Sequence, residues 1–392
     1  MRKSLLPGGG ANLFQATKAK TREAEASGQK IYRLSIGQPA GPALLSARKA
    51  AAEAVMSDLE SMHEYQDNGS PGIPDFSQRF IQAHFDFSLV GKDVAYLPIP
   101  GNKPMLGVAE LACGAAQQTY IIGTMDKPGY PTPTDWAKYL RLNQYTLPLN
   151  IENKFRFKPA DIKKGTRLLM VNYPHNPSGQ IATREWWREI CAHCEKNDIR
   201  LFNDNPYYIL SHTPESSALA EIATGFKDLS WAEAFSASKV ISNGTGWRIG
   251  AIIGSPDFVG DIATIKGNTD SGFVAPMAIG VLNAMENDKV NVKACRELYK
   301  RRIGMLKDIL IKRGMKLAIE PGAGFFTLWQ RPDKAFGQQI KDAEHFNYLM
   351  IEKTGIVGVH FEPYIRYSVT GNIEAMVKVI DDAFVQAEVG YK

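Results

Sequence analysis

Between about residues 90 and 260, short apolar runs alternate with segments of helical spacing. The apolar runs are DVAYLPI, QQTYIIGT, NQYTLPL, TRLLMVNY, DIRLFND, SWAEAFSAS and RIGAIIGS, and segments such as PTDWAKYLRL and REWWREICAHCEK separate them. This alternation is typical of a mostly parallel sheet with helices on both of its faces. We therefore predict an α/β fold whose large domain contains a mostly parallel seven-stranded sheet sandwiched by helices.

The pattern changes after residue 285. A long helical stretch is followed by the short strands MKLAIE, GFFTLWQ and YIRYSV and by a final helix. A chain of 392 residues is also longer than one hydrophobic core usually serves. We predict a large domain over residues 46–284 and a smaller α+β domain formed by residues 1–45 and 285–392.

Composition and charge argue against several classes of protein. The 46 basic and 41 acidic residues give a net charge of +5 without a long basic run, which argues against a nucleic-acid partner. No run of about 18 uncharged apolar residues could cross a membrane, and the start, MRKSLLPGGGANLF, has too short an apolar stretch for a secretory signal. Four cysteines form no disulfide framework, so we expect a cytoplasmic protein.

The segment ICAHCEK places Cys191, His193 and Cys194 close together, as a metal or redox site would. No second ligand pair follows, however, and Thr183 is suited to cap a helix over this segment. We interpret the two cysteines as half-buried side chains on one helix face and predict no metal site.

Polar and glycine-containing segments follow four of the apolar runs. These segments are PGNKP after AYLPI, NYPHNPSG after TRLLMV, DNPYY after IRLFN, and SASK after AEAF. In open α/β sheets, ligands bind at the carboxyl ends of the strands, where such loops meet. The residues with unusual chemistry are therefore expected there.

The stretch FSASKVISNGTGWRIG places Lys239 among small and polar residues. A lysine that forms a Schiff base needs a lowered pKa and a carbonyl partner held beside it. Hydroxyls, backbone N–H groups and a guanidinium bind phosphate, and Ser236, Ser238 and Arg248 supply them around Lys239. This pattern favours a chemical role for Lys239 over that of a surface lysine.

Two further segments fit the same chemistry. In IPGNKPMLG, Asn102 and Lys103 lie between a strand and a helix, so free N–H groups would face an anion, although a glycine before a helix is most often only a turn. In LFNDNPYY, Asp204 ends an apolar strand, and Tyr207 follows it. Such a carboxylate is most often a helix cap or a structural partner, but beside a pyridine cofactor it would keep the ring nitrogen protonated.

Taken in order, NYPHNPSG, DNPYY and SASKVISNGTGWRIG resemble motifs of the pyridoxal-phosphate enzymes of the aspartate aminotransferase family, class I/II aminotransferases of fold type I. The resemblance extends over about residues 33 to 385. The stretch IKGNTDSGFVAP is similar to a segment of LL-diaminopimelate and alanine-type aminotransferases. Pyridoxal 5′-phosphate is the cofactor that the resemblance implies.

Within this family, the resemblance implies that Lys239 forms the internal aldimine and later moves the proton between Cα and C4′. Asp204 would pair with the pyridine nitrogen, and Asn176 and Tyr207 would hydrogen-bond the phenolic oxygen. Tyr130 would stack on the ring face. The phosphate would be held by Ser236, Ser238, Arg248 and the amides of Asn102 and Lys103.

The resemblance also implies substrate and subunit contacts. Gly37 and Asn176 would lie beside the substrate, and Arg366 would clamp its α-carboxylate. Tyr65 would reach the phosphate of a neighbouring subunit, which implies a homodimer with shared active sites. Two departures from the family pattern are one extra residue between Lys239 and Arg248, and a shortened segment before Arg366.

The predicted activity is transamination, in which an α-amino acid leaves as its 2-oxo acid and a second 2-oxo acid takes up the amino group by a ping-pong mechanism. A C–S lyase, a decarboxylase or a synthase is the alternative, because these enzymes would share Lys239, Asp204 and Tyr207. A non-catalytic, ligand-sensing member of the fold is a third possibility. The presence of Lys239 and the lack of a DNA-binding extension count against it.

Overall fold

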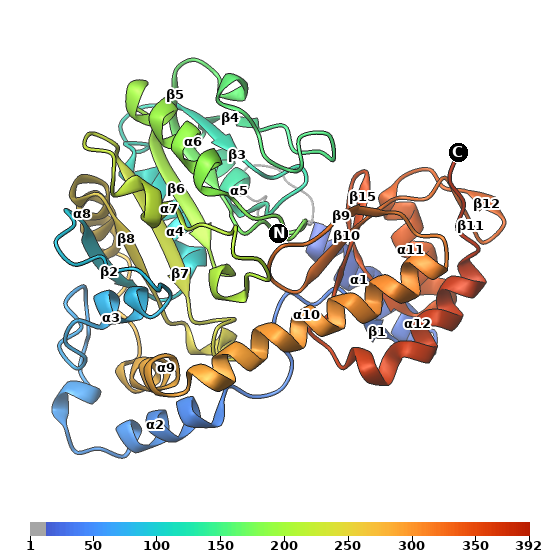
Figure 1. The fold of residues 1–392 in the computed structure, drawn as a ribbon, viewed down its shortest axis with the longest axis horizontal. Helices are drawn as coiled ribbons and strands as arrows, with labels where there is room; N and C mark the ends of the chain where they lie inside the picture. The colour runs from blue at the N-terminus through green and yellow to red at the C-terminus, as the bar shows by residue number, and fades with distance from the viewer. Residues whose placement is uncertain (1–12) are drawn as a thin grey trace, which may run out of the picture.

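The computed structural model describes residues 13–392, and within them the predicted large sheet is present (Figure 1). Its seven strands lie in the order β2-β8-β7-β6-β5-β3-β4. They are β2 (Ala95–Ile99), β3 (Ile121–Thr124), β4 (Asn143–Thr146), β5 (Thr166–Val171), β6 (Arg200–Asn205), β7 (Trp231–Ser236) and β8 (Gly250–Gly254). Strand β8 runs antiparallel to β2 and β7, and the other pairings are parallel. The predicted mostly parallel seven-stranded sheet is confirmed.

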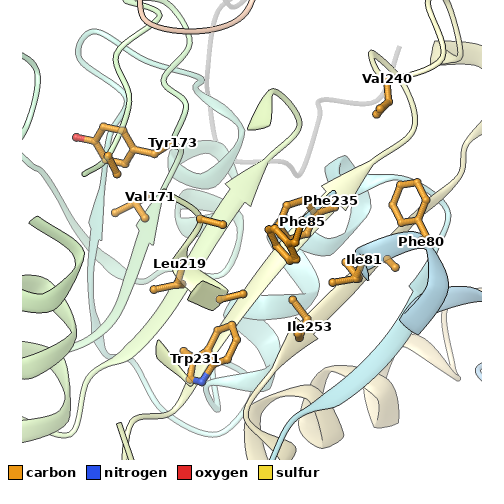
Figure 2. Packing of buried hydrophobic residues seen from close by; sticks show 14 of the residues in the cluster. Phe80, Ile81, Phe85, Val171, Tyr173, Leu219, Trp231, Phe235, Val240 and Ile253 are labelled. Atoms are coloured by element: carbon orange, nitrogen blue, oxygen red, sulfur yellow. The ribbon is translucent and has the colours of Figure 1, made fainter. Parts of the chain in front are cut away.

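Alternate side chains of the strands pack on opposite faces of this sheet. In β5, Leu168 and Met170 belong to one core cluster, whereas Leu169 and Val171 belong to the other, as the two-residue period of a strand requires. Figure 2 shows Val171 with Phe235 and other members of the second cluster.

Helices cover both faces of the sheet. The first face is packed by α4 (Asn102–Ala112), α5 (Thr132–Tyr139) and α8 (Pro256–Lys266). The second face is packed by α3 (Phe76–Gln82), α6 (Arg184–Lys196), α7 (Leu219–Ala223) and α9 (Ala275–Asn287), and α2 (Leu45–Val55) packs on α9. The central strands are therefore buried on both sides, which explains why their sequences read as nearly continuous apolar runs, whereas the edge strand β4 (NQYT) is partly exposed.

A second, smaller sheet is antiparallel and has the order β14-β15-β10-β9. Its strands are β9 (Leu317–Ile319), β10 (Phe326–Gln330), β14 (Val359–Phe361) and β15 (Tyr364–Ser368). The helices α10 (Lys289–Lys312), α11 (Ala343–Thr354) and α12 (Ile373–Ala387) belong to this part of the chain, and Figure 1 shows α10 running to it from α9. The three predicted strands are present, but β14 and the hairpin of β11 (Lys334–Ala335) and β12 (Gln338–Gln339) escaped prediction.

The N-terminal segment packs against this smaller part. Helix α1 (Leu13–Ala26) contacts α11, and β1 (Tyr32–Arg33) pairs in parallel with β13 (Ile356–Val357). The domain limits after residues 45 and 284 stay a prediction, and residues 1–12 of the predicted small domain lie outside the described residues. Between residues 13 and 392, no helix has the length and apolar character that crossing a bilayer needs.

Helix α6 contains Cys191 and Cys194, for which a metal or redox site was considered from the sequence. Thr183 caps it as predicted, since its hydroxyl oxygen accepts a hydrogen bond from the Trp186 amide at 3.3 Å. Cys191 and Cys194 have no solvent exposure and lie in the large core cluster, so the expectation that they are only half-buried is wrong. The large sheet buries this face of α6 completely.

Glu110 is an unusual charged residue in the core. It lies on α4 with no solvent exposure, and no described residue hydrogen-bonds either of its carboxylate oxygens. Burial raises its pKa from 4.5 to about 9. The folded protein therefore holds a proton at neutral pH that the unfolded chain releases, and the folded state loses stability as the pH rises from about 4.5 to about 9.

We expect Glu110→Gln to stabilise the protein more at pH 8.5 than at pH 5.5, because glutamine has the same shape and never ionises. The gain at pH 8.5 should be roughly 2 kcal/mol in the free energy of unfolding. Urea unfolding at fixed protein concentration measures it. Glu189→Gln, on an exposed face of α6, is the matched control and should change little at either pH. An equal effect of Glu110→Gln at both pH values would contradict a proton held by Glu110.

Candidate active site

One cavity of about 930 Å³ lies where the loops after β2, β5, β6 and β7 meet at the carboxyl ends of the strands. All predicted site residues except Tyr65 line it. They are Gly37, Asn102, Lys103, Tyr130, Asn176, Asp204, Tyr207, Ser236, Ser238, Lys239, Arg248 and Arg366. Segments more than 300 residues apart in the chain thus contribute to a single site.

Lys239 lies in the turn that follows β7 and is half-buried. Burial lowers the pKa of its amine from 10.5 to about 8. The carboxylate of Asp204 opposes this shift, and the guanidinium of Arg248 adds to it. A larger fraction of the amine is therefore neutral and nucleophilic at neutral pH than for an exposed lysine.

Asp204 stands near the end of β6 and is also half-buried. Burial raises the pKa of its carboxyl from 3.8 to about 6, while a hydrogen bond from Asn102 and the charge of Lys239 act in the opposite direction. The Asn102 Nδ2 atom donates to Asp204 Oδ1 at 2.7 Å and to the Ala234 carbonyl at 2.8 Å. This side-chain contact escaped prediction, and it orients the carboxylate and favours its ionised form.

An anion-binding pocket adjoins these residues at the start of α4. Gly101 precedes the helix with a φ of +78°, and a Cβ atom there would overlap the guanidinium of Arg248. Arg248 donates to the carbonyls of Pro100 and Thr245, each at 3.0 Å, so its guanidinium lies beside the helix N-terminus. The buried hydroxyls of Ser236 and Ser238 are 2.8 Å apart. Hydroxyls, a guanidinium and free helix amides together suit a phosphate group.

Arg366 is a buried cation without a carboxylate partner among the described residues. It lies on β15 with 1% exposure. Its Nη1 donates to Asn176 Oδ1 at 2.7 Å and its Nη2 to the Ser35 carbonyl at 2.9 Å, but its Nε has no partner within residues 13–392. The guanidinium carbon lies 4.2 Å from the Phe326 ring centroid, and burial lowers the pKa to about 10. An unpaired buried guanidinium is a ready site for a carboxylate ligand.

Tyr207 and Tyr130 are two of the aromatic residues that line the cavity. Tyr207 is buried and packs edge-on against Phe325 and Phe326. Burial raises the pKa of its hydroxyl well above 10, and the charge of Arg366 opposes this shift. The phenol therefore stays protonated and can donate a hydrogen bond.

Gly37 and Tyr65 lie at the edges of the predicted site. A Cβ at Gly37 would meet Phe326 Cζ at 3.8 Å, an ordinary contact, so the geometry here does not require glycine. Tyr65 is 78% exposed and lies outside the cavity of its own chain. The loop that carries it is held in place, because the amides of Gln66 and Asp67 both donate to the Ser271 carbonyl.

Several lining residues escaped prediction. They are Phe14, Gln15, Lys18, Ser35, Pro104, Pro131, Thr132, Trp136, Asn172 and Pro206. Asn172 belongs to the NYPHNPSG motif, and its side-chain Nδ2 atom donates a hydrogen bond to the backbone carbonyl of Asp204 at 2.7 Å. Helix α1, which contributes the first three, carries no motif, so no feature of its sequence indicated that it would enter the site.

Comparisons with known proteins agree with this fold. The family described as aminotransferase class I and II matches residues 29–382. LL-diaminopimelate aminotransferase 2 of Trichormus variabilis is 27% identical, with 91% of each chain covered. LL-diaminopimelate aminotransferase of Methanocaldococcus jannaschii is 29% identical over 74% of this chain and 68% of its own.

Solved structures show the same fold at lower identity. The aspartate aminotransferase from Rhizobium meliloti superimposes with a TM-score of 0.86 at 18% identity, covering 99% of this chain and 98% of that one. Substrate-bound BacF from Bacillus subtilis gives a TM-score of 0.85 at 19% identity, covering 100% of this chain and 99% of its own.

Proposed function

The chain belongs to the aminotransferase class I and II family, and we propose that it uses pyridoxal 5′-phosphate to transfer the amino group of an α-amino acid to a 2-oxo acid. The observation that carries this proposal is a single cavity that combines three features. These features are Lys239, whose amine has a lowered pKa, Asp204, whose carboxylate is oriented by Asn102, and the anion-binding pocket at the start of α4. The activity in the names of the relatives supports an α-amino acid as the donor.

The cavity residues fit this cofactor. Gly101 has a φ of +78°, and its lack of a Cβ lets the guanidinium of Arg248 lie against the backbone, so backbone, Arg248 and an anion can meet closely. The phosphate would be held by Ser236, Ser238, Arg248 and the amides of Asn102 and Lys103. Asp204 would hold the ring nitrogen, Asn176 and Tyr207 the phenolic oxygen, and Tyr130 the ring face. When bound, the cofactor supplies an electron-withdrawing ring that stabilises negative charge at the substrate Cα.

The protein's own residues would then bind the substrate, orient it and transfer the proton. Arg366 would hold the substrate α-carboxylate in a bidentate pair and so fix which Cα bond faces Lys239. Lys239, whose amine has a pKa of about 8, can take the Cα proton and return it at another atom. The hydrogen bond from Asn102 would keep the Asp204 carboxylate ionised beside the ring nitrogen.

The proposal includes a homodimer with shared sites. Tyr65 projects from a loop anchored at Ser271 and is exposed in the single chain. We propose that its hydroxyl reaches the phosphate of the neighbouring subunit, as the resemblance implies. We also propose that the protein is cytoplasmic, as its sequence predicts.

Incubation of the cofactor-loaded protein with an amino acid alone tests the reaction type. A transaminase working by two half-reactions should release one equivalent of 2-oxo acid per active site and then stop. Adding 2-oxoglutarate or pyruvate should restart it. The measurement is 2-oxo acid released over time across a panel of amino donors.

Continued product release without a 2-oxo acid acceptor would contradict transamination. It would favour the alternative, a C–S lyase or another enzyme that cleaves a different bond at Cα. A protein that takes up no cofactor would exclude both reactions.

A further inference from the structure

Glu233, on β7, has a completely buried carboxylate whose hydrogen-bond donors are all uncharged. Its Oε1 atom accepts hydrogen bonds from Asn203 Nδ2 and Asn205 Nδ2, each at 2.7 Å, and from the Leu219 amide at 3.1 Å. Its Oε2 atom accepts one from the Ala220 amide at 2.8 Å. Burial raises the pKa of Glu233, and these four hydrogen bonds act in the opposite direction. The carboxylate is therefore the centre of a buried polar cluster whose N–H groups depend on it.

The two asparagines of this cluster lie on either side of Asp204 in β6. Successive side chains of a strand point to opposite faces of a sheet, so Asn203 and Asn205 lie on the face opposite to Asp204. Asp204 lines the cavity, and neither asparagine does. Asn203 is also the register partner of Glu233 across the pair of β6 and β7. Glu233 thus fixes both chain neighbours of Asp204 from behind the sheet.

Asn203 also binds the segment that carries Asn176. Its Oδ1 accepts a hydrogen bond from the Tyr173 amide at 2.9 Å, and its Nδ2 donates to the Tyr173 carbonyl at 3.0 Å. The preceding residue, Asn172, accepts a hydrogen bond from the Asn176 amide at 2.9 Å. Glu233 is therefore connected to Asn176 through one asparagine side chain and the backbone at residues 172 and 173.

Asn205 makes the corresponding contact with the turn that carries Tyr207. Its Oδ1 accepts a hydrogen bond from the Tyr208 amide at 3.1 Å, while its Nδ2 donates to Glu233. Tyr208 directly follows Tyr207 and begins a short 3₁₀ helix. This contact therefore fixes the backbone from which the Tyr207 phenol projects.

We propose that Glu233 is a positioning residue, which aligns with the cofactor ring the side chains of Asp204, Asn176 and Tyr207. This inference rests on the proposed function. A carboxylate only accepts hydrogen bonds and so satisfies all four N–H groups at once, whereas a glutamine of the same shape would turn its own NH₂ group toward some of them. Glu233→Gln would therefore leave buried donors unsatisfied and release the asparagine side chains.

Absorption spectra of the cofactor-loaded protein, recorded as a function of pH, test this role. Hydrogen bonds from Asn176 and Tyr207 to the phenolic oxygen would favour its anionic form, so loosening them raises the pH midpoint of the spectral change. In Glu233→Gln this midpoint should rise by at least about 0.5 pH unit. Glu110→Gln is the matched control, because Glu110 is equally buried and no described residue hydrogen-bonds its carboxylate oxygens. It should keep the midpoint of the unaltered protein.

Asn205→Ala decides the matter if Glu233→Gln does not fold. It removes only the contact with Tyr208 and one donor to Glu233, so the midpoint should rise by a smaller amount. A folded variant that no longer holds the cofactor, while Glu110→Gln still does, would also support the positioning role.

An unchanged midpoint in the variants that bind the cofactor would show that Glu233 only supports the fold. An equal rise in Glu110→Gln would likewise overturn the inference, because the effect would then follow from any loss of a buried carboxylate. Both results leave the proposed function standing if 2-oxo acid is still released from amino acids. An unaltered protein that takes up no cofactor would overturn the proposed function and the inference together.

Discussion

Replacing Lys239 by alanine is expected to lower kcat for transamination about 10³-fold or more. The variant loses both the nucleophile that would bond to the cofactor aldehyde and the group that would move the proton at Cα. The half-buried Lys239 lies near the charges of Asp204 and Arg248, whereas the other two lysines that line the cavity within residues 13–392, Lys18 and Lys103, are exposed. The measurement is kcat under saturating cofactor, together with the mass of the protein after borohydride reduction. Reduction should fix the cofactor to the unaltered chain and not to the variant.

The matched control for this experiment is Lys227→Ala, at an exposed position outside the cavity. It should retain both the activity and the cofactor-bearing mass. Cofactor still fixed covalently to Lys239→Ala would contradict the assignment, and Lys103 would then be the next lysine to replace.

Arg366→Ala is expected to raise KM for every α-amino acid about 100-fold, with a smaller effect on kcat. A bidentate pair between a buried guanidinium and a carboxylate contributes about 3 kcal/mol to binding, and it forms before any bond breaks. Arg366 has no carboxylate partner among residues 13–392, so removing it leaves no buried acid uncompensated.

Arg366→Lys extends the same test, because lysine keeps the charge but lacks the planar fork, and KM should remain well above that of the unaltered protein. Arg188→Ala, at an exposed position on α6, is the matched control and should leave KM unchanged. An unchanged KM in Arg366→Ala would show that another arginine binds the α-carboxylate.

Much of the fold could be predicted because its elements are defined by local patterns. The seven strands of the large sheet each coincide with an apolar run, since burial on both faces demands apolar residues at successive positions. Short edge elements were harder. Strand β14 has three residues and the β11–β12 hairpin pairs two with two, which is too short for a period to be recognised.

The candidate site, too, could be predicted from the sequence only in part. The motifs around Lys239, Asp204 and Asn176 lie at the ends of predicted strands, and strands that run parallel bring such ends to one edge of a sheet. Their gathering in one cavity thus followed from the sequence, and their chemical roles stay predictions. The role of Arg366 depended on the resemblance, because a single arginine in a strand indicates nothing by itself.

By itself, the sequence determined the alternating elements, the small neighbours of Lys239 and the order of the motifs, because each is a property of residues close together in the chain. The tertiary structure alone decided which side chains meet across long separations. In the folded chain, Asn102 hydrogen-bonds Asp204, and Arg366 hydrogen-bonds Asn176 and the Ser35 carbonyl. Helix α1, with Lys18, forms part of the cavity wall. Burial is the physical reason, since the pKa shifts of Asp204, Lys239 and Glu110 all arise from desolvation that only the packed protein imposes.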